Sequence, residues 1–147
     1  MDIQRFNRQI EFIAEIDKVK QILRNTILMD ASRRENDAEH TWHMAMGAMI
    51  LSEYANEKSL DMLKVFEMIL LHDIVEIDAG DTFAYANVNL QEKAEKEKRA
   101  AERIFGLLPA DLADKLIKTW DEYEAADTPE AQFAQAMDSF MPILHNL

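Results

Sequence analysis

Apolar residues recur every three or four positions along most of this chain. In the N-terminal segment these positions include Ile3, Phe6, Ile10 and Ile13. Their spacing predicts an amphipathic helix over about residues 3 to 24. No alternation of apolar and polar residues continues for more than a few positions, and the sequence contains no internal repeat. The pattern therefore predicts an all-α protein.

Five further helices follow from the same spacing and from helix-capping residues. They are expected over about residues 38 to 56, 60 to 77, 90 to 107, 109 to 126, and from 128 towards the end of the chain. The first of these five is apolar on nearly all sides, which is typical of a central, buried helix. Pro109 and Pro129 favour helix starts, and Gly80 is a common type of helix end. We expect a single bundle of about six helices.

Two polar segments separate the predicted helices. Residues 29 to 37 are rich in Asp, Ser and Asn, so we expect a loop that ends in a helix cap. Residues 79 to 89 form a second expected loop, in which Phe83 and Tyr85 are candidates to cover a neighbouring surface. The helix that follows contains EKAEKEKRAAER, and such a charged run favours an outer helix in contact with solvent.

Composition excludes several classes of protein. The chain has 147 residues, typical of one domain, and no cysteine, so disulfides and thiolate metal sites cannot form. The lack of cysteine, of a secretory signal and of an apolar run of about 18 residues predicts a cytoplasmic protein with no membrane partner. The net charge is −12, from 28 acidic and 16 basic residues, which disfavours nucleic acid polymers as partners. A small anion remains an acceptable ligand where a metal ion or a few arginines neutralise it.

The candidate chemistry begins with the motifs DAEHTWHMA (37–45) and LLHDIVEIDAGD (70–81). A single histidine on a helix is more often a hydrogen-bonded core residue than a metal ligand. The pair His72 and Asp73 shifts this balance, because an adjacent imidazole and carboxylate can converge on an ion beside the helix. The alternative for the pair is a buried hydrogen-bonded couple, since a two-residue motif alone is a weak signal.

A third segment supplies another carboxylate. Asp138 lies on an apolar stripe with Met137 and Met141, where an unpaired charge would be costly. A histidine of the first motif, the His72–Asp73 pair and Asp138 would together offer two imidazoles and two carboxylates. On a six-coordinate ion this set leaves two positions, which suit a water and a phosphate oxygen. The donors admit Mn, Fe, Co, Ni or Zn, so the identity of the metal stays open.

The order H…HD…D in an all-helical chain resembles the HD-domain metal-dependent phosphohydrolases. Longer motifs look like the subfamily of 5′-deoxynucleotidases, and the likeness runs from about residue 5 to the end of the chain. They are ENDAEHTWHMA, LLHDIVEIDAGD and WDEYEAADTPEAQFAQAMD. The resemblance implies an HD domain over residues 1–147 and a homodimer. Because relatives of this kind usually continue by about a helix, we expect a truncated C-terminus.

The resemblance also implies a role for each residue of the site. One divalent transition-metal cation would be held by His40, His72, Asp73 and Asp138. Glu76 would be the catalytic acid or base, and Asp81 would contact a sugar or a water. The spacing supports Glu76, which lies one helical turn beyond the His72–Asp73 pair. The alternatives are an exposed helix-end acid for Glu76 and a turn cap for Asp81.

A phosphate ligand calls for an arginine, whose forked group grips two oxygens at once. The candidates are Arg24, Arg33 and Arg34, and each could instead be a surface charge. The resemblance favours Arg24, expected at the end of the first helix, with Arg33 as the reserve.

Two further residues of the motif segments are expected to be structural. We expect Trp42 in the core rather than stacked on a base. His145 follows Asp138 by two turns, roughly 10 Å along a helix, which is too far to share the same ion.

These observations predict a phosphomonoesterase acting on (deoxy)nucleoside 5′-monophosphates. One alternative is hydrolysis of another phosphorylated nucleotide, either an alarmone or a cyclic nucleotide. Few basic residues lie near the motifs, which disfavours the alarmone. The other alternative is a metal- or nucleotide-binding module without turnover. The presence of Glu76 and Asp81 argues against this module, since a degenerate site should lose these residues first.

Overall fold

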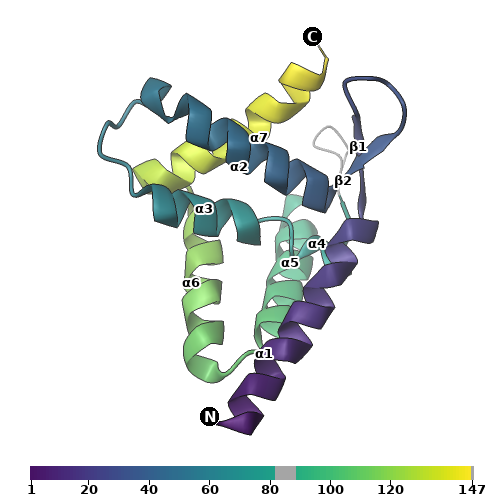
Figure 1. Cartoon of the computed structure of the whole chain (residues 1–147), viewed down its shortest axis with the longest axis vertical. Coiled ribbons are helices and arrows are strands. Elements are labelled where there is room, and N and C mark those ends of the chain that lie inside the picture. Colours follow the sequence, from purple (N-terminus) through teal and green to yellow (C-terminus); the bar gives the residue numbers. More distant parts are fainter. Residues whose placement is uncertain (82–88, 147) are drawn as a thin grey trace.

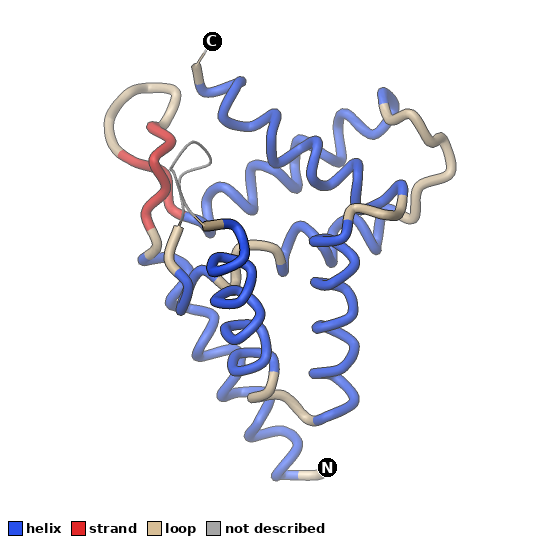
Figure 2. Tube along the Cα trace, turned by 180° about the vertical axis from the view of Figure 1, so that it is seen from behind, coloured by secondary structure: helices blue, strands red, loops and turns tan. Residues whose placement is uncertain are grey.

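The computed structural model describes residues 1–81 and 89–146 and is mostly helical, as predicted (Figure 1). Phe83 and Tyr85 lie outside the described residues. In chain order the elements are α1 (Ile3–Ile16), η1 (Asp17–Gln21), β1 (Leu23–Ile27), β2 (Arg34–Asn36), α2 (Asp37–Leu51), η2 (Ser52–Tyr54), α3 (Met62–Leu71), α4 (Glu76–Ala79), α5 (Leu90–Phe105), α6 (Ala110–Ala125) and α7 (Pro129–His145). Helices α1, α5 and α6 make up the end of the molecule where the N-terminus lies, and α2, α3 and α7 lie across the other end of these helices (Figures 1 and 2).

The first helix is shorter than its sequence predicts, and an unpredicted hairpin follows it. Helix α1 ends at Ile16, and the one-turn element η1 leads into β1, which pairs antiparallel with β2 (Figure 2). Leu23 lies opposite Asn36, and Ile27 opposite Arg34. The hairpin was not predicted, although the described residues still form an all-α fold apart from it. The alternation of exposed and half-buried residues covers only the five residues of β1, which is too short to stand out in the sequence.

The third predicted helix is broken at the residues of greatest chemical interest. Helix α3 ends at Leu71, residues 72–75 form a turn, and α4 begins at Glu76. In this turn the amide of Ile74 donates to Leu71, and that of Glu76 to Asp73, which are tighter bonds than those of an α-helix. Gly80 ends α4 with a φ of 77°, as expected for a glycine at a helix end. The break places His72 and Asp73 in a buried turn.

Two clusters of apolar side chains form the core. One joins α1, α5 and α6; its members include Phe12, Ala101, Ile104, Phe105 and Trp120. The other joins α2, α3 and α7; its members include Met44, Val65, Met68, Ala134 and Met141. Leu71 belongs to the first cluster and Ile69 to the second, so the His72–Asp73 turn begins where the two clusters meet.

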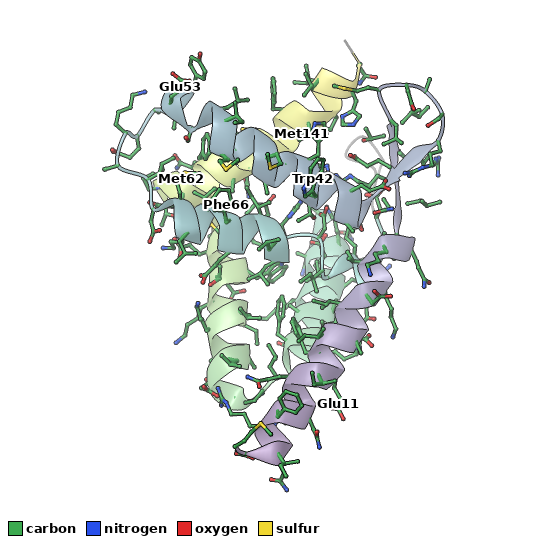
Figure 3. The ribbon with its side chains drawn as sticks, viewed as in Figure 1. Glu11, Trp42, Glu53, Met62, Phe66 and Met141 are labelled. Atoms are coloured by element: carbon green, nitrogen blue, oxygen red, sulfur yellow. The ribbon has the colours of Figure 1, made fainter. Side chains whose placement is uncertain are left out.

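Helix α2 is buried on one face only. Met44 and Ala48 are inaccessible, whereas Trp42 and Ile50 expose 67% and 63% of their surface. Trp42 is labelled on α2 in Figure 3. The prediction that Trp42 packs in the core was therefore wrong, and so was the prediction of a helix buried on all sides. The outward face of α2 is apolar as well, so its composition gave no sign of exposure.

Within the described ranges, no helix combines the length and the apolar character needed to cross a bilayer.

Candidate metal centre

The start of α2 fixes the position of the first predicted ligand. Asn36 caps the helix by accepting from the Glu39 amide at 3.0 Å, and Glu39 Oε2 accepts from the Asn36 amide at 3.3 Å. This reciprocal capping box defines where the first helical turn begins. As a result, Asp37 and His40 point inward, and both are buried.

The four predicted metal ligands come together from three parts of the chain. His40 Nε2 lies 2.9 Å from Asp138 Oδ1 of α7. His72 Nε2 lies 3.1 Å from Asp73 Oδ2 and 3.9 Å from Asp138 Oδ1. One ligand atom each from His40, His72 and Asp73 falls within 4.8 Å of the others. We call these four residues the inner cluster; their role as ligands stays a prediction.

The hydrogen bonding of His72 suits a cation at this point. Its Nδ1 lies 2.6 Å from the carbonyl oxygen of Ile69, which can only accept, so Nδ1 carries the hydrogen. In the neutral ring, Nε2 then carries a lone pair, which is directed at the carboxylates of Asp73 and Asp138. This buried nitrogen has no hydrogen-bond partner among the described residues. Two imidazoles and two carboxylates are also a suitable donor set for a divalent transition metal.

Charges within the inner cluster stabilise one another. Burial would raise the pKa of Asp73, but His72 and Arg24 hold it below its usual range. Burial likewise acts against a charged His40, yet Asp138 and Glu35 raise the pKa of His40 to about 9. A metal ion must therefore displace protons from the imidazoles, and its binding is coupled to pH.

Of the three candidate arginines, Arg24 reaches the inner cluster. It lies on β1, not at the end of a helix as expected, and its Nη1 is 2.6 Å from Asp73 Oδ2. Its Nη2 is 3.7 Å from Asp138 Oδ1. Arg33 instead pairs with Glu39 at 2.6 and 2.8 Å, and Arg34 donates to Asn25 at 3.0 Å, both on the exposed surface.

Glu76 combines burial with a surplus of neighbouring negative charge. Burial, followed by Asp73, Asp37 and Asp81, raises its pKa to about 10. Its buried Oε2 also has no hydrogen-bond partner among the described residues. In the metal-free protein Glu76 therefore holds a proton at neutral pH.

The inner cluster opens into a cleft of about 920 Å³, within the size range of small-molecule sites. Its walls include Arg24, Glu76, Asp81, Lys93 and Tyr123. Asp81 is half-buried there, beside the carboxylate of Glu76.

Two buried carboxylates next to the inner cluster were not among the predicted site residues. Asp37 Oδ1 lies 3.4 Å from Arg24 Nη1, and Glu35 Oε2 lies 3.5 Å from His40 Nδ1. Both are at most 1% exposed, although they were expected in a polar loop and cap. The capping-box pair Asn36 and Glu39 was the available signal. This pair satisfies the free backbone N–H groups at the start of α2 by itself, so Glu35 and Asp37 are available for other contacts.

Comparisons with known proteins point to one family. Residues 16–147 match the family described as HD domain. The human 5′-deoxynucleotidase HDDC2 is 29% identical over 136 residues, which cover 92% of this chain and 65% of that protein. The 5′-deoxynucleotidase hdd1 of Schizosaccharomyces pombe is 32% identical over 72% of this chain and 54% of its own length. The chain thus spans about two thirds of the human protein.

A solved structure has the same fold along nearly the whole chain. It is described as a predicted metal-dependent phosphohydrolase from Magnetospirillum magnetotacticum MS-1. The two chains are 52% identical and superpose with a TM-score of 0.91, over 97% of this chain and 70% of the other.

Proposed function

Because the chain belongs to the HD domain family, we propose that it is a metal-dependent phosphohydrolase acting on (deoxy)nucleoside 5′-monophosphates. The observation that carries the proposal is the convergence of two imidazoles and two carboxylates beside a cleft of about 920 Å³. The names of its curated relatives, 5′-deoxynucleotidases, support the substrate class.

The inner cluster, His40, His72, Asp73 and Asp138, would hold one divalent transition-metal cation. When bound, such an ion lowers the pKa of a coordinated water towards about 7 and neutralises charge on a phosphate. The protein orients these ligands through its own hydrogen bonds. The carbonyl of Ile69 fixes the ring of His72, and Glu35 lies beside the outer nitrogen of His40.

Arg24 would bind the phosphate. Its guanidinium lies in the cleft wall and reaches Asp73 and Asp138, so a phosphate oxygen near the inner cluster comes within its range. A planar guanidinium can donate to two phosphate oxygens at once, which orients the ester as well as neutralising it.

Glu76 would move the proton of the reaction. It lies one turn beyond the proposed ligands His72 and Asp73, where a carboxyl can take a proton from the attacking water or donate one to the oxygen that leaves the phosphorus. In the metal-free protein, burial and the neighbouring carboxylates raise its pKa. Asp81, in the cleft wall beside Glu76, would contact the sugar or a water.

A screen for phosphate release tests the proposal. Deoxy- and ribonucleoside 5′-monophosphates are incubated with the full chain and with Mn²⁺, Co²⁺, Mg²⁺ or Zn²⁺, and EDTA serves as the control. We expect release that depends on the metal and stops with EDTA. If no monophosphate is hydrolysed with any ion, the substrate class is wrong, and alarmones and cyclic nucleotides become the next compounds to assay.

The proposal includes a cytoplasmic homodimer. The dimer is supported by an apolar stripe on the outward face of α2. The stripe is formed by Trp42, Met46, Met49 and Ile50, which expose between 39% and 67% of their surface. Apolar patches of this kind often mark interfaces. Light scattering of the purified chain at micromolar concentration should give the mass of a dimer, and Trp42→Glu should give a monomer. A monomeric wild-type chain would exclude the dimer.

A further inference from the structure

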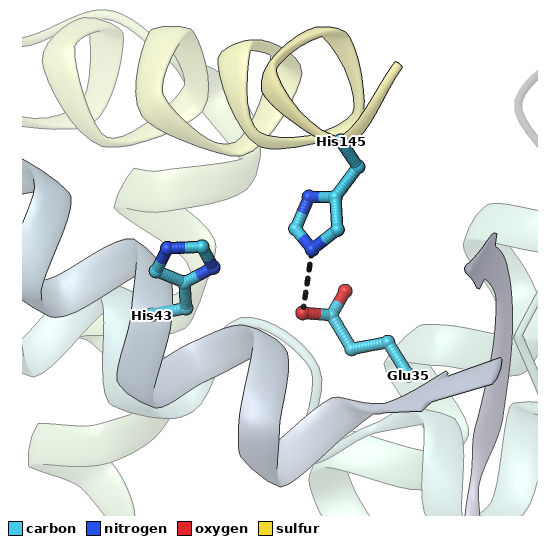
Figure 4. A group of neighbouring side chains, drawn as sticks. All are labelled: Glu35, His43 and His145. Carbon is cyan, nitrogen blue, oxygen red and sulfur yellow. Dashed lines mark ion pairs between the residues drawn. The ribbon is translucent and has the colours of Figure 1, made fainter. Parts of the chain in front are cut away.

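A second group of possible metal ligands lies outside the inner cluster. It consists of Glu35 from β2, His43 from α2 and His145 from the last residue of α7 (Figure 4). One ligand atom from each lies within 4.8 Å of the others. We call these three residues the outer cluster. Nothing in the proposed reaction uses His43 or His145.

The hydrogen bonding of His145 leaves a lone pair directed at a carboxylate. Its Nδ1 lies 2.8 Å from the carbonyl oxygen of Met141, so Nδ1 carries the hydrogen. In the neutral ring, Nε2 can only accept, and it faces Glu35 Oε1 at 3.5 Å (Figure 4). The side chains of His145 and Glu35 are 4% and 2% exposed. The other oxygen of Glu35, Oε2, lies towards His40 Nδ1 and has no hydrogen-bond partner among the described residues. The two acceptors that face each other, Nε2 and Oε1, would be stabilised by a cation or an additional proton between them.

The separation of the two atoms favours a shared ion over a hydrogen bond. A direct N–H···O bond spans roughly 2.7–3.2 Å. Two ligands of one tetrahedral Zn²⁺, each bound at about 2.0–2.1 Å, stand roughly 3.4 Å apart. The observed 3.5 Å matches the second arrangement.

His43 completes the set on the open side. Its ring meets that of His145 edge-on, with the ring centroids 5.4 Å apart, and it is half-buried. A half-buried side chain on a helix can turn towards an ion without disturbing the core. Two imidazoles and one carboxylate are a donor set that Zn²⁺ accepts, with one position left for water.

We propose that Glu35, His43 and His145 form a second metal site, which takes Zn²⁺ and keeps one position for water. The ion would join the end of α7 to β2 and the start of α2. It would also fix Glu35, whose other oxygen lies 3.5 Å from His40 Nδ1 in the inner cluster. The outer site stands on these contacts alone and does not depend on the proposed reaction.

The number of bound ions tests the site. The full chain is stripped with a chelator and dialysed against buffered free Zn²⁺, and bound metal is measured by mass spectrometry. We expect two equivalents in the wild type and one in His43→Gln, with two retained in the exposed-surface control Glu53→Gln. Asp73→Asn, in the inner cluster, should also bind one equivalent, and the double variant none.

A measurement on the wild-type chain tests the site even if a variant fails to fold. Imidazole ¹⁵N NMR should show the Nε2 signal of His145 move to the range of a metal-bound nitrogen as the second equivalent is added. A protonated Nε2 at saturating Zn²⁺ would overturn the site and leave an imidazolium–carboxylate ion pair. So would a single equivalent in the wild type that Asp73→Asn abolishes, or two equivalents in a folded His43→Gln. Phosphate release does not enter these readouts, so failure of the proposed reaction leaves the result interpretable.

Discussion

His40 and His43 lie one turn apart on α2, yet they join clusters with different charge. His40 meets Asp138 and lies 4.0 Å from Asp73, in a group that also contains Arg24. His43 shares a single carboxylate, Glu35, with His145. His40, His72 and Asp73 are buried, whereas His43 is half-buried, and His145 lines the same cleft as the inner cluster.

This difference in charge predicts a difference in chemistry. Two carboxylates with Glu76 and Asp37 nearby can neutralise a dication and still leave Arg24 to attract a phosphate. One carboxylate with two imidazoles holds an ion but offers neither an acid nor an arginine for a reaction. Glu35 contacts both clusters, because one oxygen faces His40 and the other faces His145. The two clusters can therefore be disturbed separately or together.

Removing a charge from the inner cluster should have the largest effect. Asp73→Asn keeps the shape of the side chain but removes the charge that pairs with both His72 and Arg24. We expect the inner metal to be lost and kcat for phosphate release to fall by ~1000-fold or more. Metal analysis and initial rates measure the two losses, and Asp121→Asn, a substitution at an exposed residue, serves as the control. A variant that keeps its metal and its rate would show that Asp73 is not a ligand.

Glu76→Gln should separate the chemistry from metal binding. The amide cannot give up a proton, so kcat should fall by roughly 100-fold or more. The inner metal should remain, since Glu76 is outside the inner cluster. Steady-state kinetics and metal analysis are compared with those of Glu102→Gln, an exposed change on α5. Unchanged turnover would show that Glu76 is not the group that moves the proton.

Glu35→Gln should affect both clusters at once, with a smaller effect on the inner one. Losing the carboxylate beside His40 Nδ1 should weaken the inner metal by about 10-fold, as expected for a residue that orients a ligand. The ion of the outer cluster should disappear. Isothermal titration measures both, and excess metal should restore kcat. If kcat stays low at saturating metal, Glu35 has a role beyond the positioning of His40.

The sequence was sufficient for residues whose chemistry is carried by their own motif. His40, His72, Asp73 and Asp138 stand in segments whose resemblance to a known family is specific, and the structure brings them together. Two helix boundaries, the end of α4 at Gly80 and the start of α7 at Pro129, follow from the backbone restrictions of single residues. These are local signals, and they could be predicted without a fold.

The sequence was insufficient where a distant partner decides the outcome. Asp37 and Glu35 look like loop acids until Arg24 and His40 are placed beside them. Arg24 itself reaches the inner cluster from a strand, because the five residues of β1 pair with a segment beyond the hairpin loop. Trp42 was wrongly assigned to the core because the apolar outward face of α2 has the same composition as a buried face.

The pH dependence of stability should report the charge of the inner cluster. Glu76 has its pKa raised from 4.5 to about 10, so its contribution is complete below pH 4.5 and is lost as pH rises towards 10. His40, raised from 6.5 to about 9, contributes with the same sign up to pH 9. Asp73 and Asp138 have lowered pKa values, so their contributions are lost only at acid pH.

The metal-free protein should therefore be most stable near pH 5. We expect its Tm to fall by roughly 10 °C or more between pH 5 and pH 9. Glu76→Gln should flatten part of this slope, because the amide does not titrate. Calorimetry in EDTA measures both proteins. A Tm that rises over this interval would mean that the acids beside Glu76 do not govern its proton.

Removing the N-terminal cap of α2, the helix that contributes a histidine to each cluster, should have the smallest effect on stability and metal binding. Asn36→Ala removes the acceptor for the Glu39 amide, which should cost about 1 kcal/mol and lower Tm by about 2–4 °C. His40 is in the first turn and His43 one turn later, so fraying should weaken the inner metal more than the outer one. Asn36→Asp should keep the cap, and Asn56→Ala, in an exposed loop, should change neither property. Equal weakening at both clusters would indicate that α2 moves as a rigid unit and that the cap does not distinguish its two histidines.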